Sequence, residues 1–165
     1  MDTRHINKTY FISADDEGDD AITAYGPETT TLIEDCVIDF RGLSLDEQDE
    51  AISGVNGAKV IIRRCLIIGA KKALLAGNGD YPLMDLVEGR WLIEDSILWE
   101  CGRRCPEAQD GVRVTMKRCW IHNFGKRFDE RAFGAWSHLG AEIYAEDCLF
   151  TQSKGIFGLG VITTI

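Results

Sequence analysis

One eight-residue frame recurs five times along the chain, and this repeat restricts the possible folds more than any other feature. Apolar residues hold the same slots in every copy, and the copies are about 23 to 31 residues apart. A drifting period of this length is typical of stacked repeats and unlike a single compact layered domain. The five copies are Thr31 TLIEDCVI, Val60 VIIRRCLI, Trp91 WLIEDSIL, Val114 VTMKRCWI and Ile143 IYAEDCLF.

A charged pair occupies the middle of each frame, and its sign changes from one copy to the next. Equivalent residues of parallel strands in register lie about 4.8 Å apart, where opposite charges attract and like charges repel. We therefore expect each basic pair to lie between acidic pairs of the coils above and below; the alternative is a coincidence of surface charge. The pairs are Glu34-Asp35, Arg63-Arg64, Glu94-Asp95, Lys117-Arg118 and Glu146-Asp147.

Cysteine follows the charged pair in four copies, and Ser96 takes its place in the third. Small side chains flanked by apolar residues predict a buried ladder; a disulfide framework is the alternative. Cys101 and Cys105 form the only close pair, and no CxxC metal spacing is present. The ladder residues are Cys36, Cys65, Cys119 and Cys148.

A second, weaker series of short apolar segments with small residues lies between the frames. Short strands, Gly and Asn turns and the absence of a 3.6-residue period all argue against helices. We expect residues 1–165 to form one all-β domain, a single-stranded right-handed parallel β-helix of about six coils. The segments of the second series are 19–26, 49–57, 71–79, 109–114, 131–140 and 154–160.

Composition and the terminal segments lead to expectations about binding partners, location and oligomeric state. The net charge is −9, which argues against a general binder of nucleic acid or anionic membranes. No apolar run reaches membrane-spanning length, and the first twenty residues do not resemble a signal peptide, so we expect an intracellular or a trimmed protein. The apolar segment 155–165 has no obvious cap, and because open strand edges invite pairing, we expect a homo-oligomer through this end.

The residues that head the second series are acidic in the first repeats and basic in the next. Clustered carboxylates suit Ca²⁺, and neighbouring cations suit an acidic substrate; a solvated charged face is the alternative. The acidic candidates for metal binding are Asp20, Asp49 and Glu50, and the basic candidates are Lys71, Lys72 and Arg131.

Four tryptophans supply a further candidate surface. Exposed indole rings could form a platform on which sugars stack, whereas core packing is the alternative use. Trp99 and Trp136 fall near predicted strand ends and are the better candidates for substrate binding, ahead of Trp91 and Trp120.

The order of several short motifs resembles the pectate lyases of polysaccharide lyase family 1. The resemblance runs from about Asp20 to Ile121. Its three parts are DDAI followed by LIEDCVI, GAKKALLAGNGD with Lys72 on the substrate lysine, and ILWECGRRCPEAQDGVRV with Arg104 on the first residue of an Arg-x-Pro motif.

This resemblance implies β-elimination in a uronate polysaccharide. Ca²⁺ held by Asp20, Asp49 and Glu50 would bind the uronate carboxylate, Lys72 would help to neutralise it, and Arg104 would remove the C5 proton. Gln109 stands where the family has a second arginine. A non-catalytic β-helix, acting as a carbohydrate-binding or a host or phage interaction module, is therefore the alternative function.

Overall fold

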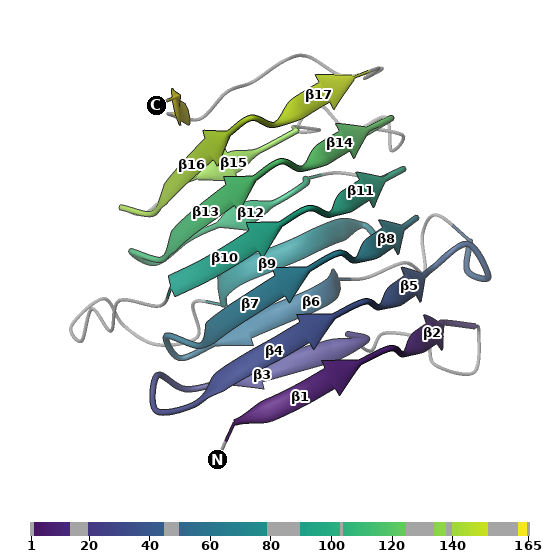
Figure 1. Cartoon of the computed structure of the whole chain (residues 1–165), viewed down its shortest axis with the longest axis horizontal. Coiled ribbons are helices and arrows are strands. Elements are labelled where there is room, and N and C mark those ends of the chain that lie inside the picture. Colours follow the sequence, from purple (N-terminus) through teal and green to yellow (C-terminus); the bar gives the residue numbers. More distant parts are fainter. Residues whose placement is uncertain are drawn as a thin grey trace.

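The computed structural model describes residues 2–13, 20–44, 50–78, 90–102, 104–124, 134–137, 140–151 and 162–164. These residues form coils that are stacked along one axis, and the strands of successive coils pair into three parallel sheets (Figure 1). The predicted class, an all-β parallel β-helix, is confirmed. Within these ranges there is no helix, and so none that is long and apolar enough to cross a membrane.

Each sheet collects one strand from each successive coil. Sheet A contains, in order, β1 (Thr3–Ile6), β4 (Thr30–Glu34), β7 (Lys59–Arg63), β10 (Arg90–Glu94), β13 (Arg113–Lys117), β16 (Glu142–Glu146) and β18 (Ile162–Thr164). Sheet B contains β2 (Thr9–Phe11), β5 (Val37–Asp39), β8 (Leu66–Ile68), β11 (Ile97–Trp99), β14 (Trp120–His122) and β17 (Leu149–Thr151). Sheet C contains β3 (Ile22–Tyr25), β6 (Glu50–Val55), β9 (Lys72–Asn78), β12 (Glu107–Ala108) and β15 (Trp136–Ser137).

The recurring frame is two strands joined by a sharp corner. At the corner, Arg64 has a φ of 50°, in the left-handed region that turns the chain from sheet A to sheet B. Its N–H donates to the carbonyl of Glu94 in the next coil at 3.1 Å, so the hydrogen-bonded ladder continues through the bend. The equivalent corner residues are Asn7, Asp35, Asp95, Arg118 and Asp147.

Two details differ from the sequence-based expectation. Five of the coils contribute a strand to all three sheets within the described residues, so the coil count differs slightly from the predicted six. The expected strand 109–114 is also wrong: Asp110 and Gly111 have positive φ and form a turn, whereas the strand of this coil is β12, just upstream. The segment 154–160 lies outside the described residues.

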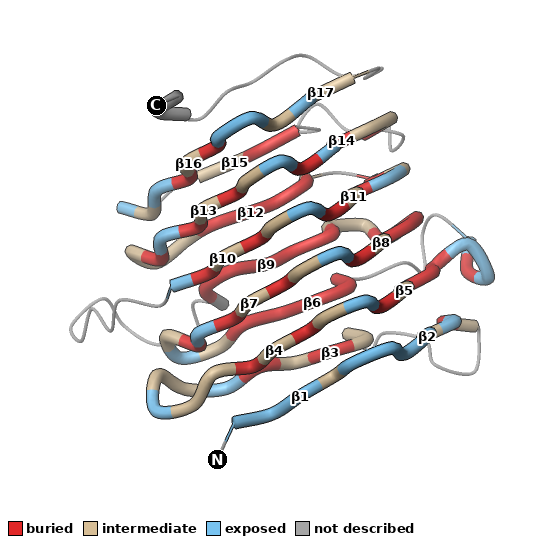
Figure 2. Tube along the Cα trace, in the orientation of Figure 1, coloured by how far each residue is buried: buried red, intermediate tan, exposed pale blue. Residues whose placement is uncertain are grey.

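The core is the interior of the coil, and sheet C is its most buried wall (Figure 2). All residues of β6 from Glu50 to Gly54 are buried. Trp91 of β10 is 2 % exposed and crosses the interior to reach sheet C. A Cβ atom on Gly54 would lie 2.4 Å from Trp91 Cζ2, so this glycine provides the space for the indole ring.

The alternating charges lie in register, as predicted. Arg63 pairs in the ladder with Glu34 on one side and Glu94 on the other, and its Nε donates to Glu94 Oε2 at 3.0 Å. Arg64 forms ion pairs with Glu34 and Asp35 of the preceding coil. Hydrogen bonds from Arg64 lower the pKa of Asp35. Because these groups are exposed, the pattern defines register more than it adds stability.

Reversing one charge of this ladder tests the register directly. Arg64→Glu places a carboxylate among Glu34, Asp35 and Asp95, so we expect a lower melting temperature at low ionic strength and a smaller loss at high salt. The double variant Asp35→Arg/Arg64→Glu restores an opposite pair and recovers part of the loss. Lys59→Glu, at the start of the strand that leads to this corner, is the control; a loss equal to that of Arg64→Glu would contradict the ladder.

Candidate functional site

Three of the predicted site residues meet where the strands of sheet C begin. Glu50 pairs in register with Lys72, and Lys72 forms a backbone bridge with Arg104. The three residues come from consecutive coils, so the topology brings together side chains that are 22 and 32 positions apart in the sequence. Parallel stacking, which the repeat predicts, is the cause of this alignment.

The side chains of this group neutralise one another. Lys72 Nζ lies 2.6 Å from Glu50 Oε1 and 3.4 Å from Glu107 Oε2. Arg104 Nη1 forms an ion pair with Glu107 Oε1. The side chains of Lys72 and Arg104 are only 15 % and 11 % exposed, and that of Glu107 is 3 % exposed. We call Glu50, Lys72, Arg104 and Glu107 the sheet C charge cluster.

Glu107 is the residue that the sequence analysis missed. It follows Pro106 and belongs to β12, a strand of two residues that gives no period-2 pattern to recognise. The available signal was the excess of cations among the residues heading the later strands, since buried cations require a nearby anion.

Trp136, a predicted sugar-stacking residue, is half-buried beside the charge cluster; its role in sugar binding stays a prediction. The Arg104 guanidinium carbon lies 5.1 Å from the centre of the Trp136 ring, within the range of a cation–π contact. Trp136 also pairs in register with Glu107. One face of the indole is therefore occupied by a side chain of the charge cluster.

Asp20 lies beside the cluster, two residues before β3. Its Oδ2 accepts a hydrogen bond from Thr23 Oγ1 at 3.3 Å. Burial first, and then the nearby Glu50 carboxylate, raise the pKa of Asp20, although hydrogen bonds from Ser53 and Thr23 oppose the rise. The folded protein thus disfavours the charged form of this carboxyl group.

The substitution Asp20→Asn tests this environment. A pKa raised above its usual value of 3.8 means that ionisation costs stability, and the cost grows as pH rises through the folded-state pKa. Asp20→Asn should therefore raise the melting temperature at about pH 7 and leave it nearly unchanged at about pH 3. The matched control Asp35→Asn should have the opposite effect at neutral pH, because the pKa of Asp35 is lowered. Equal effects of both variants would contradict the assignment.

The described residues leave the predicted calcium site untested. Among them there is no group of three or more His, Cys, Asp or Glu side chains able to hold a metal ion. The Lys72 ammonium already lies beside Glu50 and would compete with a cation. Asp49, the third predicted ligand, lies outside the described residues, as does Arg131. Calcium binding stays a prediction.

The outer face of sheet B is a second candidate surface. The middle residue of each inner strand is buried, and strand alternation places the first and third residues on the opposite, outer face, where the third residues Asp39 and Ile68 of the earlier coils are nevertheless covered. One outward row consists of apolar side chains that become more exposed toward the C-terminal coils. This row is Val37, Leu66, Ile97, Trp120 and Leu149.

An aromatic cluster stands on this face. Trp99 and Trp120 keep 38 % and 37 % of their surface exposed. The His122 ring lies 5.5 Å from that of Trp99 and 4.8 Å from that of Trp120. Thr151 fixes two of these rings, because Trp120 Nε1 donates to its Oγ1 at 2.6 Å and His122 Nδ1 lies 2.8 Å from the same oxygen. We call Trp99, Trp120 and His122 the aromatic cluster.

The structure places the tryptophans of the sequence analysis in different environments. Trp99 is exposed on the outer face, as a stacking platform requires, whereas Trp91 is buried in the core. Trp120, which the sequence placed behind Trp99 as a candidate, is equally exposed. It holds the first outward slot after the ladder cysteine, the slot of Leu66 and Ile97 in earlier coils.

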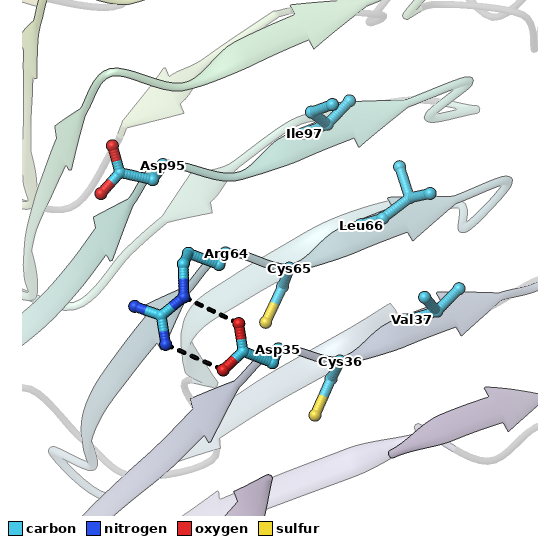
Figure 3. A pocket seen from close by; sticks show the side chains of 8 residues that line it. All are labelled: Asp35, Cys36, Val37, Arg64, Cys65, Leu66, Asp95 and Ile97. Atoms are coloured by element: carbon cyan, nitrogen blue, oxygen red, sulfur yellow. Dashed lines mark hydrogen bonds and ion pairs between the residues drawn. The ribbon is translucent and has the colours of Figure 1, made fainter. Parts of the chain in front are cut away.

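A shallow hollow of about 340 Å³ borders the apolar row at the corner between sheets A and B (Figure 3). Charged corner side chains line one side, apolar side chains line the other, and two ladder cysteines lie between them. The lining residues are Asp35, Arg64, Asp95, Val37, Leu66, Ile97, Cys36 and Cys65.

Comparison with known proteins found no matching family model, no matching curated protein and no matching solved structure. The β-helix fold is established by the structure, whereas membership of the pectate lyase family stays an expectation from short motifs.

Proposed function

We propose that this protein is a non-catalytic β-helix that binds a glycan on the outer face of sheet B. The observation that carries the proposal is the aromatic cluster, in which two indole rings remain more than one-third exposed. Trp and Tyr at binding surfaces supply large, rigid contact area with a polar tip. The C–H face of a pyranose ring is a natural partner for such a surface.

Charge favours an uncharged sugar over a polyuronate. Three arginines that border this face are already paired: Arg64 with Asp35, Arg118 with Asp95 and Arg41 with Asp39. A polyanion would have to displace these pairs and approach a chain of net charge −9. Hydroxyl groups, in contrast, can bond to the paired carboxylates along the hollow of Figure 3 without separating them.

Glycan binding is tested by removing the exposed rings. Trp99→Ala and Trp120→Ala should each weaken binding by about tenfold or more, the loss typical of a central aromatic anchor. Binding is first detected on immobilised neutral and acidic polysaccharides, and affinity is then measured by titration calorimetry with oligosaccharides of the preferred type.

Tyr25→Ala is the matched control, because Tyr25 is 66 % exposed and belongs to sheet C. It should leave the affinity unchanged. Absence of binding to every polysaccharide, or an equal loss in the Tyr25 and Trp120 variants, would overturn the proposal. Selective capture of polygalacturonate that survives loss of both tryptophans would instead move the binding site to sheet C.

The second candidate is β-elimination at the sheet C charge cluster. It is supported by one observation: Lys72 and Arg104 lie side by side, as the resemblance implies. Against it, both side chains are largely covered, and Arg104 is engaged by Glu107 and Trp136. The test is the ultraviolet absorbance of unsaturated uronate products formed from polygalacturonate with and without Ca²⁺. Absorbance lost in Arg104→Lys would support catalysis, and no absorbance under either condition would exclude this substrate.

A further inference from the structure

The cysteine ladder contains two facing pairs of thiols. Cys36 and Cys65 are opposite each other because Val37 pairs with Leu66. The register of Trp120 with Leu149 likewise places Cys148 opposite Cys119. All four are free cysteines, so one fold presents the same chemical pair twice in the same corner geometry.

The two pairs differ in access. Cys36 and Cys65 are 1 % and 3 % exposed, and Cys119 is 2 % exposed, whereas Cys148 is half-buried. Within the described part of the chain, the ladder ends at Cys148, so this thiol has a ladder neighbour on one side. The equivalent slot of an inner coil is covered on both sides.

The surroundings of Cys148 favour a thiolate. The Cys119 N–H donates to Cys148 Sγ at 3.5 Å, and a hydrogen bond from the Cys119 thiol lowers the pKa of Cys148 to about 7, although burial and Asp147 oppose the change. In its protonated form, Cys148 donates to the Glu146 carbonyl at 3.4 Å. In the other pair, burial raises the pKa of Cys65 to about 11.

We propose that Cys148 is a thiol–disulfide exchange site that accepts a small-molecule disulfide of the glutathione type. The proposal rests on the facing thiols, the N–H donated by Cys119 and the partial exposure of Cys148. It does not depend on glycan binding. The Cys36–Cys65 pair remains inert because the fold encloses both of its sulfur atoms.

The exchange is a single displacement. The Cys148 thiolate attacks one sulfur of oxidised glutathione, a new S–S bond forms between them, and the S–S bond of the reagent breaks. The leaving glutathione thiolate takes a proton from water. One disulfide is consumed and one mixed disulfide is formed, so the step requires no other oxidant. Cys119 acts as a positioning residue that donates to the attacking sulfur.

The test uses the native chain at neutral pH. After exposure to oxidised glutathione and an acid quench, mass spectrometry with peptide mapping should find one glutathionyl group, on Cys148, and unmodified Cys36, Cys65 and Cys119. The initial rate should exceed that of an ordinary thiol by about threefold, because the larger thiolate fraction is partly offset by the lower intrinsic nucleophilicity of a low-pKa thiolate. Cys148→Ser should abolish the reaction and Cys65→Ser should leave it unchanged. Modification of all four cysteines at similar rates, or none at Cys148, would overturn the proposal.

The role of Cys119 is separated from a folding effect by its serine variant. Ser96 occupies the same slot and donates to the Glu94 carbonyl at 2.7 Å, so Cys119→Ser should fold and retain a donor. The pH–rate midpoint of Cys148 should stay near that of the native chain in Cys119→Ser and rise in Cys119→Ala. Far-ultraviolet circular dichroism confirms that each variant is folded. An unchanged midpoint in a folded Cys119→Ala would remove the positioning role of the Cys119 thiol, because the backbone N–H of residue 119 is present in every variant.

Discussion

Replacing Gly54 with valine should be among the most damaging single substitutions in this chain. An added Cβ would meet Trp91 Cζ2 at 2.4 Å, far inside normal contact distance, and Nε1 at 3.2 Å. Because interiors are close-packed, the ring and the opposing sheet must separate. Overpacking of this kind costs about 1–3 kcal/mol and occasionally more. We expect a loss of at least about 3 kcal/mol for Gly54→Val, measured by urea unfolding.

A double-variant cycle shows whether the indole is the cause. Gly54→Ala should be less destabilising than Gly54→Val. Adding Trp91→Phe to Gly54→Val should recover stability, because the smaller ring no longer overlaps the added side chain. Trp91 Nε1 makes no hydrogen bond within the described residues, so phenylalanine forfeits no such bond there. If Gly54→Val unfolds at the native denaturant concentration, the packing argument fails.

Loss of Glu107 should destabilise the protein to a similar degree. This carboxylate lies between the cations of Lys72 and Arg104 and is 3 % exposed. Glu107→Ala leaves two largely buried cations to share Glu50, and breaking a buried ionic group by removing one partner typically costs about 3–5 kcal/mol. The midpoint of urea unfolding should therefore fall well below that of the native chain.

Two companion variants define the source of this loss. Glu142→Ala removes the partner of Arg113 in a pair whose side chains are about half exposed, and it should change the unfolding midpoint little, since exposed pairs contribute little. Glu107→Gln keeps the shape and an acceptor but removes the charge, and its midpoint should fall between those of the native and alanine proteins. A Glu142→Ala loss as large as that of Glu107→Ala would show that burial does not govern these pairs.

The fold class could be predicted from the sequence because the repeated frame indicates stacked coils and the alternating charges indicate their register. The ladder around Arg63 and Arg64 followed from Coulomb's law and the strand spacing alone. The corner between sheets A and B could not be predicted, because left-handed φ values at Arg64 or Arg118 contradict ordinary residue preferences. Backbone hydrogen bonds to the next coil maintain these φ values. A reader of the sequence sees one apolar run where the structure has two strands.

The candidate site was anticipated in part for the same reason. Glu50 and Lys72 could be aligned because each heads a strand of sheet C, whereas Arg104, three residues before β12, was indicated only by the resemblance of its Arg-x-Pro motif. Glu107 could not, because its strand is only two residues long. The outward orientation of Trp120 could have been predicted, because the face on which a residue lies follows from its sequence separation from the ladder cysteine. Exposure itself depends on what covers a sheet, and a repeat pattern does not encode that.

The alternating signs along the axis impose a parity rule on the length of this protein. A duplicated single coil would place two acidic or two basic corners next to each other, whereas insertion or deletion of two consecutive coils would preserve every attraction. Growth of such a chain by gene duplication is therefore expected in even steps, and an engineered version lengthened by an odd number of coils would need one corner recoded to the opposite sign.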